Sequence, residues 1–180
     1  MDISGLEFMG ENVRNSLKCC GEGVRLNPLG KICKPEVVEI GDFSRVCDFA
    51  FIWGGRGVII GSYTDIQVHV SIWGGGECII GNYVSVGLGS ILLTAVYDYK
   101  GGLKMVDGLL EDEATALYGK LVIENDVYIG AHCTILPNII IGEGAIIGAH
   151  SMVNKNVDPW SIVVGCPAKK IADRPRIGKK

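Results

Sequence analysis

Aliphatic residues recur at every sixth position along most of the sequence, in three early blocks and one longer late block. A step of six fits neither the period of an α-helix nor the simple alternation of a strand, but three six-residue sides close one triangular coil of about 18 residues. The aliphatic residue of each side should point inward and stack on its counterpart in the next coil, about 4.8 Å away. These inward positions are Ile40, Val46, Ile52, Ile60, Ile66, Ile72, Ile80, Val86, Leu92, Ile123, Ile129, Ile135, Ile141, Ile147 and Val153.

Glycines and tryptophans mark equivalent points of successive coils. Gly41, Gly61 and Gly81 follow at intervals of 20 residues, and Trp53 and Trp73 repeat at the same interval. Self-similarity at a fixed period is typical of a solenoid, in which each buried aliphatic side chain contributes roughly 1.5–3 kcal/mol. The pattern therefore predicts an all-β fold, a parallel β-helix of hexapeptide repeats over residues 37–158.

The chain before the repeat should cap its open end. Residues 1–36 form this predicted N-terminal cap, with a short helix over residues 4–20, because Leu6, Val13 and Leu17 share one helical face.

The repeat is broken once, and the chain continues beyond it. Between Leu92 and Ile123 a polar, glycine-bearing stretch should leave the helix as an excursion loop at about residues 95–120. Long excursions from a compact repeat are usually functional. Residues 159–180 form a C-terminal tail.

The composition excludes several classes of function. With 48% hydrophobic and 21% charged residues, the chain can bury a full core, and its formal net charge of -3 offers no basic surface to a nucleic acid. Acidic residues interrupt the N-terminal stretch where a signal peptide would be apolar, and no apolar run reaches the roughly 18 residues of a membrane span. We therefore expect a cytoplasmic protein with no nucleic-acid partner and no membrane span.

The stretch IGAHCTILPNIIIGEGAIIGAHSMVNKNVDPWSIVVGCPAKKI resembles the terminal coils of bacterial hexapeptide-repeat acyltransferases, especially galactoside, maltose and polysaccharide O-acetyltransferases. The resemblance covers roughly residues 37–172. It implies a left-handed β-helix, a homotrimer, and acetyl-CoA as a cosubstrate bound in the groove between subunits.

The same resemblance implies which residues bind acetyl-CoA. Ala131 and Ala149 would offer backbone contacts to the pantetheine arm, Asn154 and Lys155 would lie beside it, and Lys169 would reach the phosphates. Lys169 replaces a frequent arginine, so it keeps the charge and loses the bidentate fork.

The position of the family's catalytic base differs in this sequence. That base is a histidine just after the third coil, and here Tyr97 takes its place, followed by Asp98. Tyrosine is a poor base at neutral pH, although its hydroxyl can position a substrate or donate to an oxyanion. His69 is an alternative base, because it follows Gln67, which matches an acceptor-binding asparagine of the galactoside enzymes. We expect His69, Tyr97 and Asp98 to be catalytic and Gln67 to bind the substrate.

The three histidines should share one corner of the prism, which reads Phe49, His69, Gly89, His132 and His150 in coil order. The glycine should leave room there for a ligand. We expect no metal site, because His69 would lie two coils, about 10 Å, from His132. The seven cysteines form no CxxC pair, which argues against a structural zinc ion as well.

These observations predict an acetyltransferase that moves an acetyl group from acetyl-CoA to a hydroxyl or amino group of a sugar or nucleotide sugar, in surface polysaccharide synthesis. An amine acceptor makes less demand on a protein base and so suits the absence of the usual histidine. The alternative is a non-catalytic hexapeptide-repeat protein that binds a partner through the excursion loop. The absence of the base favours this alternative, and the retained KNVDPWSIVVGCPAKK segment favours the enzyme.

Overall fold

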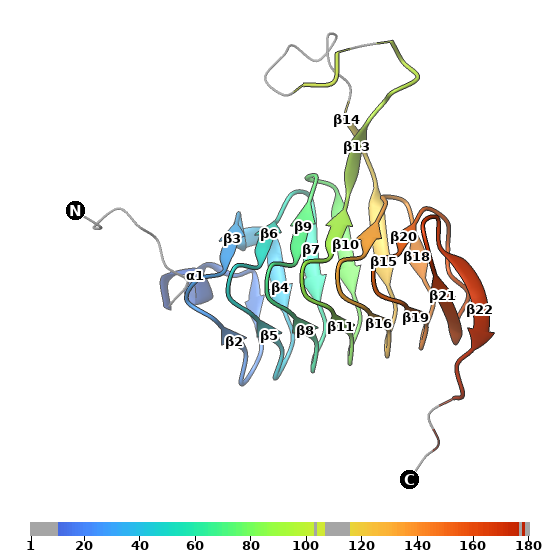
Figure 1. Ribbon diagram of the computed structural model, residues 1–180. Coiled ribbons are helices and arrows are strands. Elements are labelled where there is room, and N and C mark those ends of the chain that lie inside the picture. The colour runs from blue at the N-terminus through green and yellow to red at the C-terminus, as the bar shows by residue number, and fades with distance from the viewer. Residues whose placement is uncertain (1–10, 103, 107–115, 177, 179–180) are drawn as a thin grey trace.

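The computed structural model describes residues 11–102, 104–106, 116–176 and 178. Three sheets form the sides of a β-solenoid (Figure 1), and their strands are parallel except for the last, β22; this confirms the predicted fold class. Sheet A contains β1 (Cys19–Cys20), β4 (Val38–Ile40), β7 (Gly57–Ile60), β10 (Glu77–Ile80), β15 (Lys120–Ile123) and β18 (Ile140–Ile141). Sheet B contains β2 (Arg25–Leu26), β5 (Arg45–Val46), β8 (Asp65–Ile66), β11 (Ser85–Val86), β16 (Tyr128–Ile129), β19 (Ile146–Ile147), β21 (Ser161–Val164) and β22 (Lys169–Asp173). Sheet C contains β3 (Lys31–Cys33), β6 (Phe51–Trp53), β9 (Ser71–Trp73), β12 (Ile91–Leu93), β17 (Thr134–Ile135) and β20 (Met152–Val153).

The core is the set of aliphatic columns that the six-residue step predicts. Each of the inward positions named above is at most 1% exposed. The residues two places earlier are buried as well, including Val127, Cys133 and Ala145. Parallel pairing in strict register stacks each coil on the next, for example Ile40 on Ile60.

The N-terminal segment differs from the prediction. The helix α1 spans only Glu11–Ser16, and Cys19 and Cys20 form strand β1 paired with β4, so a helix extending to residue 20 is wrong. The part of that prediction over residues 4–10 lies outside the described residues. The solenoid begins before residue 37, since Cys20, Leu26 and Ile32 continue the six-residue step.

A 3-10 turn, Pro35–Val37, links the first coil to the second.

The excursion between Leu92 and Ile123 leaves the solenoid as a two-stranded arm (Figure 1). Its stem pairs β13 (Ala95–Tyr97) with β14 (Ala116–Tyr118) antiparallel. At the other end of the chain, β22 turns back and pairs antiparallel with β21. Within the described residues, no helix combines the length and the apolar character needed to cross a bilayer.

Candidate active site

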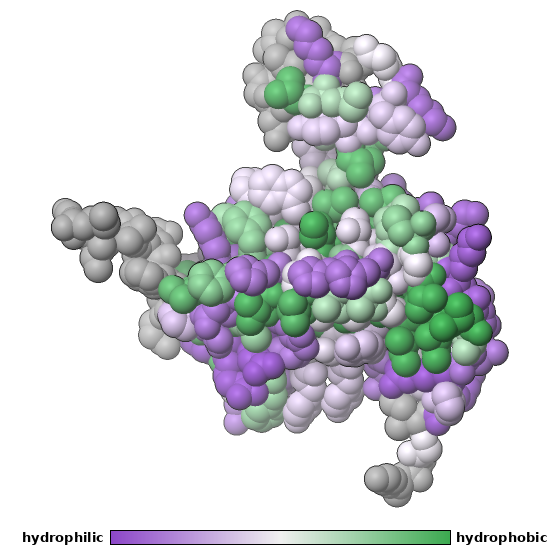
Figure 2. Space-filling model, in the orientation of Figure 1, coloured by the Kyte–Doolittle hydropathy of each residue, from purple (hydrophilic) through white to green (hydrophobic). Residues whose placement is uncertain are grey.

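A cavity of about 470 Å³ lies at the foot of the arm, between the stem and the outer surface of sheet C. Hydrophobic residues gather at this junction (Figure 2). This cavity is called the arm cavity. Its walls are Trp53, Trp73, Gly74, Gly75, Leu93, Ala95, Val96, Tyr97, Ala116 and Tyr118.

Two tryptophans form the solenoid side of the arm cavity. Trp53 ends β6 and Trp73 ends β9, one coil further on, and their ring centroids lie 5.5 Å apart with the planes tilted by 56°. Trp73 remains 48% exposed, which is high for a residue of this size. The tryptophan side chains point outward because the residues directly before them, Ile52 and Ile72, point into the core.

The arm contributes the facing wall. Ala95 pairs with Tyr118 and Tyr97 pairs with Ala116, so an aromatic and a small residue alternate across the two strands. The guanidinium carbon of Arg56 lies 4.6 Å from the ring centroid of Tyr118. Arg56 does not itself line the cavity, but it places a cation over the ring of Tyr118, which does.

Asp98 lies directly after Tyr97, where β13 ends. The backbone N–H of Lys100 donates to its Oδ1 at 3.0 Å, and the N–H of Gly101 donates to its carbonyl oxygen at 3.3 Å. This turn holds the half-buried carboxylate at the edge of the arm. Of the predicted catalytic residues, Tyr97 lines the arm cavity, and Asp98 follows it in sequence just outside the lining.

His69 does not join them within one chain. It lies at the corner before β9, whereas Tyr97 follows the far end of β12, so the strands of sheet C separate the two. A strand of three residues spans about 3.3 Å per residue, so His69 and Tyr97 lie more than roughly 10 Å apart once the corners are added. A role for His69 beside Tyr97 would require a second subunit.

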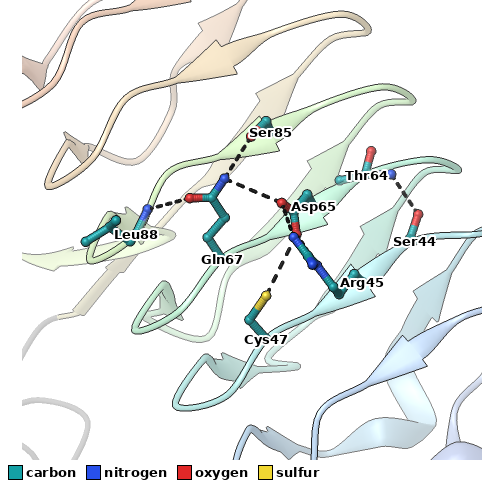
Figure 3. Close-up of polar contacts among 8 residues, drawn as sticks. All are labelled: Ser44, Arg45, Cys47, Thr64, Asp65, Gln67, Ser85 and Leu88. Carbon is teal, nitrogen blue, oxygen red and sulfur yellow. Dashed lines mark hydrogen bonds and ion pairs between the residues drawn. The ribbon is translucent and has the colours of Figure 1, made fainter.

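Gln67 belongs to a polar cluster on the outer surface of sheet B (Figure 3). Its Nε2 donates to Asp65 at 3.4 Å and to Ser85 at 3.3 Å, and its Oε1 accepts the backbone N–H of Leu88 at 3.2 Å. Asp65 also accepts two hydrogen bonds from Arg45, at 2.9 and 2.8 Å. The hydrogen bonding of Arg45 to the carboxylate of Asp65 is the main reason that the pKa of Arg45 is raised.

The histidine corner forms as predicted, but without space for a ligand at Gly89. The corner residues all have positive φ, and their rings stack in pairs: Phe49 on His69 at 5.0 Å and His132 on His150 at 5.2 Å. A Cβ on Gly89 would lie 2.5 Å from the imidazole of His132. The prediction of space for a ligand at Gly89 is wrong, because the imidazole of His132 fills that space.

The residues predicted to bind acetyl-CoA lie around the last coils. Ala131 and Ala149 follow one another at the histidine corner, where the N–H of His150 donates to the carbonyl of Ala131 at 2.9 Å. Asn154 and Lys155 follow β20 at the other end of the strand, and both are exposed. Lys169 begins β22 and is also exposed.

Across the described parts of the chain, no three His, Cys, Asp or Glu side chains converge in a way that could hold a metal ion.

Trp53, Trp73, Arg56 and Tyr118 are absent from the site that the sequence predicts. In the sequence pattern the two tryptophans appear only as markers of the repeat. Their repetition next to glycines, just before an excursion, is the signal that indicates a site here.

Comparison with known proteins agrees with this architecture. The family model for bacterial transferase hexapeptide (six repeats) matches residues 120–155. A dTDP-4-amino-4,6-dideoxy-D-glucose acyltransferase of Escherichia coli is 31% identical over 161 residues, which cover 88% of this chain and 83% of that protein. A chloramphenicol acetyltransferase of Klebsiella aerogenes is 54% identical over 56 residues, which cover 31% of this chain and only 27% of that relative.

Among solved structures, a variant of AntD, an N-acyltransferase from Bacillus cereus, superposes with a TM-score of 0.87 at 31% identity. The match covers 94% of this chain and 91% of AntD, which in that crystal is in complex with dTDP-4-amino-4,6-dideoxyglucose and coenzyme A. The shared repeat and the extent of these two long matches lead to one conclusion: the chain belongs to the hexapeptide-repeat acyltransferases.

Proposed function

We propose that this protein transfers an acyl group from acyl-CoA to the amino group of a dTDP-linked 4-amino sugar. The observation that supports this most strongly is the match to AntD over nearly the full length of both chains. The long match to an acyltransferase named for the same amino sugar supports it independently. Acetyl is the first acyl group to test, although AntD has also been crystallised with 3-hydroxybutyryl-CoA.

The proposed reaction uses the groups at the foot of the arm. The amine nitrogen attacks the thioester carbonyl carbon, so a C–N bond forms and the C–S bond breaks. Asp98 accepts the proton that the amine loses, and the departing thiolate of coenzyme A takes up a proton, which leaves an amide and a free thiol. The Tyr97 hydroxyl orients the acceptor or donates to the developing oxyanion.

The remaining roles follow the family pattern. Ala131, Ala149, Asn154 and Lys155 would contact the pantetheine arm, and Lys169 would neutralise phosphate charge. The predicted roles of His69 and Gln67 need these residues to approach Tyr97 and Asp98 from a neighbouring subunit, which a homotrimer could provide. A nucleotide-sugar acceptor agrees with the predicted role of a cytoplasmic enzyme in surface polysaccharide synthesis.

The test is an assay with acetyl-CoA and dTDP-4-amino-4,6-dideoxyglucose, using the analogue with a 4-hydroxyl group as the matched acceptor. Thioester loss should be followed by absorbance and the product by mass spectrometry, because Cys19 and Cys166 are exposed and would react with a thiol reagent. We expect turnover of the amine and little turnover of the alcohol. Binding of both substrates with no turnover would support the non-catalytic alternative.

A further inference from the structure

We propose that the arm cavity binds the base and diphosphate of the nucleotide acceptor, with the base against Trp53 and Trp73 and the diphosphate near Arg56. This inference rests on the proposed function and adds to it the part of the chain that recognises the nucleotide. The volume of about 470 Å³ lies within the usual range for small-molecule sites.

The aromatic walls suit a flat ring. The Trp53 and Trp73 rings are close enough to act as one surface, and Phe51 extends it with a ring centroid 5.4 Å from that of Trp73. Tyr118 faces this surface from the arm. Stacking of a base on an aromatic side chain tolerates any base and contributes substantially to affinity.

Gly75 keeps this space open. It has a φ of 80°, in a region that side chains rarely adopt. A Cβ on Gly75 would lie 3.4 Å from Tyr118 Cε1 and 3.5 Å from Trp53 Nε1, so its position lies between the two rings. A side chain there would occupy the space that the rings enclose.

Charge favours a nucleotide over the acyl chain of the cosubstrate. An acyl chain needs only an apolar wall, whereas Arg56 brings a guanidinium whose geometry suits phosphate oxygens. The order of residues on the arm agrees with this orientation, because Tyr97 lines the cavity and Asp98 follows it. An acceptor whose base occupies the cavity can therefore extend its sugar amine towards Asp98.

Tryptophan fluorescence during titration with dTDP tests the inference. The chain has three tryptophans, of which Trp53 and Trp73 line the cavity, whereas Trp160 lies in the last coil beside Arg174. We expect dTDP to quench the wild type and Trp160→Phe equally. Trp73→Ala should weaken dTDP binding at least about tenfold, as the loss of one stacking contact implies.

A second variant separates charge from stacking. Arg56→Gln should weaken binding of dTDP and leave binding of thymidine, which has no phosphate, nearly unchanged. Wild-type dTDP binding that neither Trp73→Ala nor Arg56→Gln alters would overturn the inference and leave the proposed function intact.

Three further outcomes would also count against the inference. If Trp73→Ala weakens acetyl-CoA binding instead, the cavity holds the acyl chain. If it changes the sedimentation of the protein and not dTDP binding, the cavity is a contact between subunits. If the wild type binds no dTDP and acylates no dTDP-amino sugar, the proposed function fails together with the inference.

Discussion

The imidazole of His132 lies over Gly89, in the space that a side chain at position 89 would fill. A Cβ on Gly89 would come within 2.5 Å of both Nδ1 and Cε1 of this ring. The other members of the corner, including His69 and His150, are not glycines although their φ values are 60° and 58°. The backbone conformation alone therefore does not require glycine at position 89, whereas the position of His132 does.

Gly89→Ala should lower the free energy of unfolding by about 1–3 kcal/mol because His132 must move. In a His132→Ala background the same change should have a much smaller effect, since the colliding ring is absent. Urea unfolding of the four proteins of this cycle measures the difference. Equal losses in both backgrounds would show that backbone strain, and not the imidazole, sets the need for glycine.

Stability should fall at alkaline pH because of Cys78. Burial raises the pKa of this thiol from 9.0 to about 12. The unfolded chain loses the proton near pH 9 and the folded chain keeps it, so the contribution is fully present below pH 9 and is lost as the pH rises towards 12. Between pH 8 and 10.5 the wild type should lose about 2 kcal/mol relative to a variant without the thiol.

Cys78→Val is the matched variant for this measurement, because Val58 occupies the equivalent position one coil earlier. Denaturant unfolding at pH 8 and pH 10.5 should give a steeper loss for the wild type. Identical losses would mean that Cys78 ionises no less readily in the folded protein.

Asp98→Asn should reduce kcat by about 10²–10⁴-fold, the usual contribution of general base catalysis, while acetyl-CoA binding stays unchanged. The amide oxygen can still accept the N–H of Lys100, so the turn should persist. His69→Ala is the comparison, and we expect a smaller loss of kcat, because Asp98 accepts the proton in the proposed reaction and His69 could reach this site only from a neighbouring subunit. If Asp98→Asn keeps its activity and His69→Ala loses it, the base is His69 of a neighbouring subunit.

Asp65→Asn should destabilise the fold by about 1 kcal/mol, since it weakens a bidentate pair with Arg45 that is only partly solvent-screened. Glu39→Gln removes the charge of the 2.6 Å pair with Lys18 on the neighbouring sheet, where Lys18 is largely exposed. Thermal unfolding should detect the first change and not the second. Similar melting temperatures for the wild type and Asp65→Asn would show that the cluster around Gln67 is held without this ion pair.

The sequence predicts the solenoid well because its core repeats a single environment. Each inward aliphatic residue occupies the same position in its six-residue side, so Ile60 and Ile147 need the same side-chain type although they lie in different sheets. The six-residue pattern does not predict the first coil, because Cys20 and Leu26 occupy positions where the later coils have isoleucine or valine. Cys20 also lies within the predicted N-terminal helix.

The arm cavity could not be predicted because its two walls are far apart in sequence. Trp53 and Tyr118 meet only after the arm folds back beside the coils, and periodicity contains no information about that pairing. The sequence predicts correctly that the three histidines share one corner. It does not predict that the ring of His132 lies over Gly89, because a repeat fixes the positions of the backbone and not the directions of the side chains.

The antiparallel strand β22 has a consequence for the solution behaviour of the molecule. A solenoid whose last coil ended in a bare parallel strand would present a row of unpaired N–H and C=O groups, onto which a second molecule could add end to end. Here β22 covers β21, and every residue of β22 is exposed. Its outer edge carries Lys169, Lys170 and Asp173, charges that oppose further strand addition. We therefore expect β22 to oppose end-to-end addition of a second molecule at this end of the solenoid.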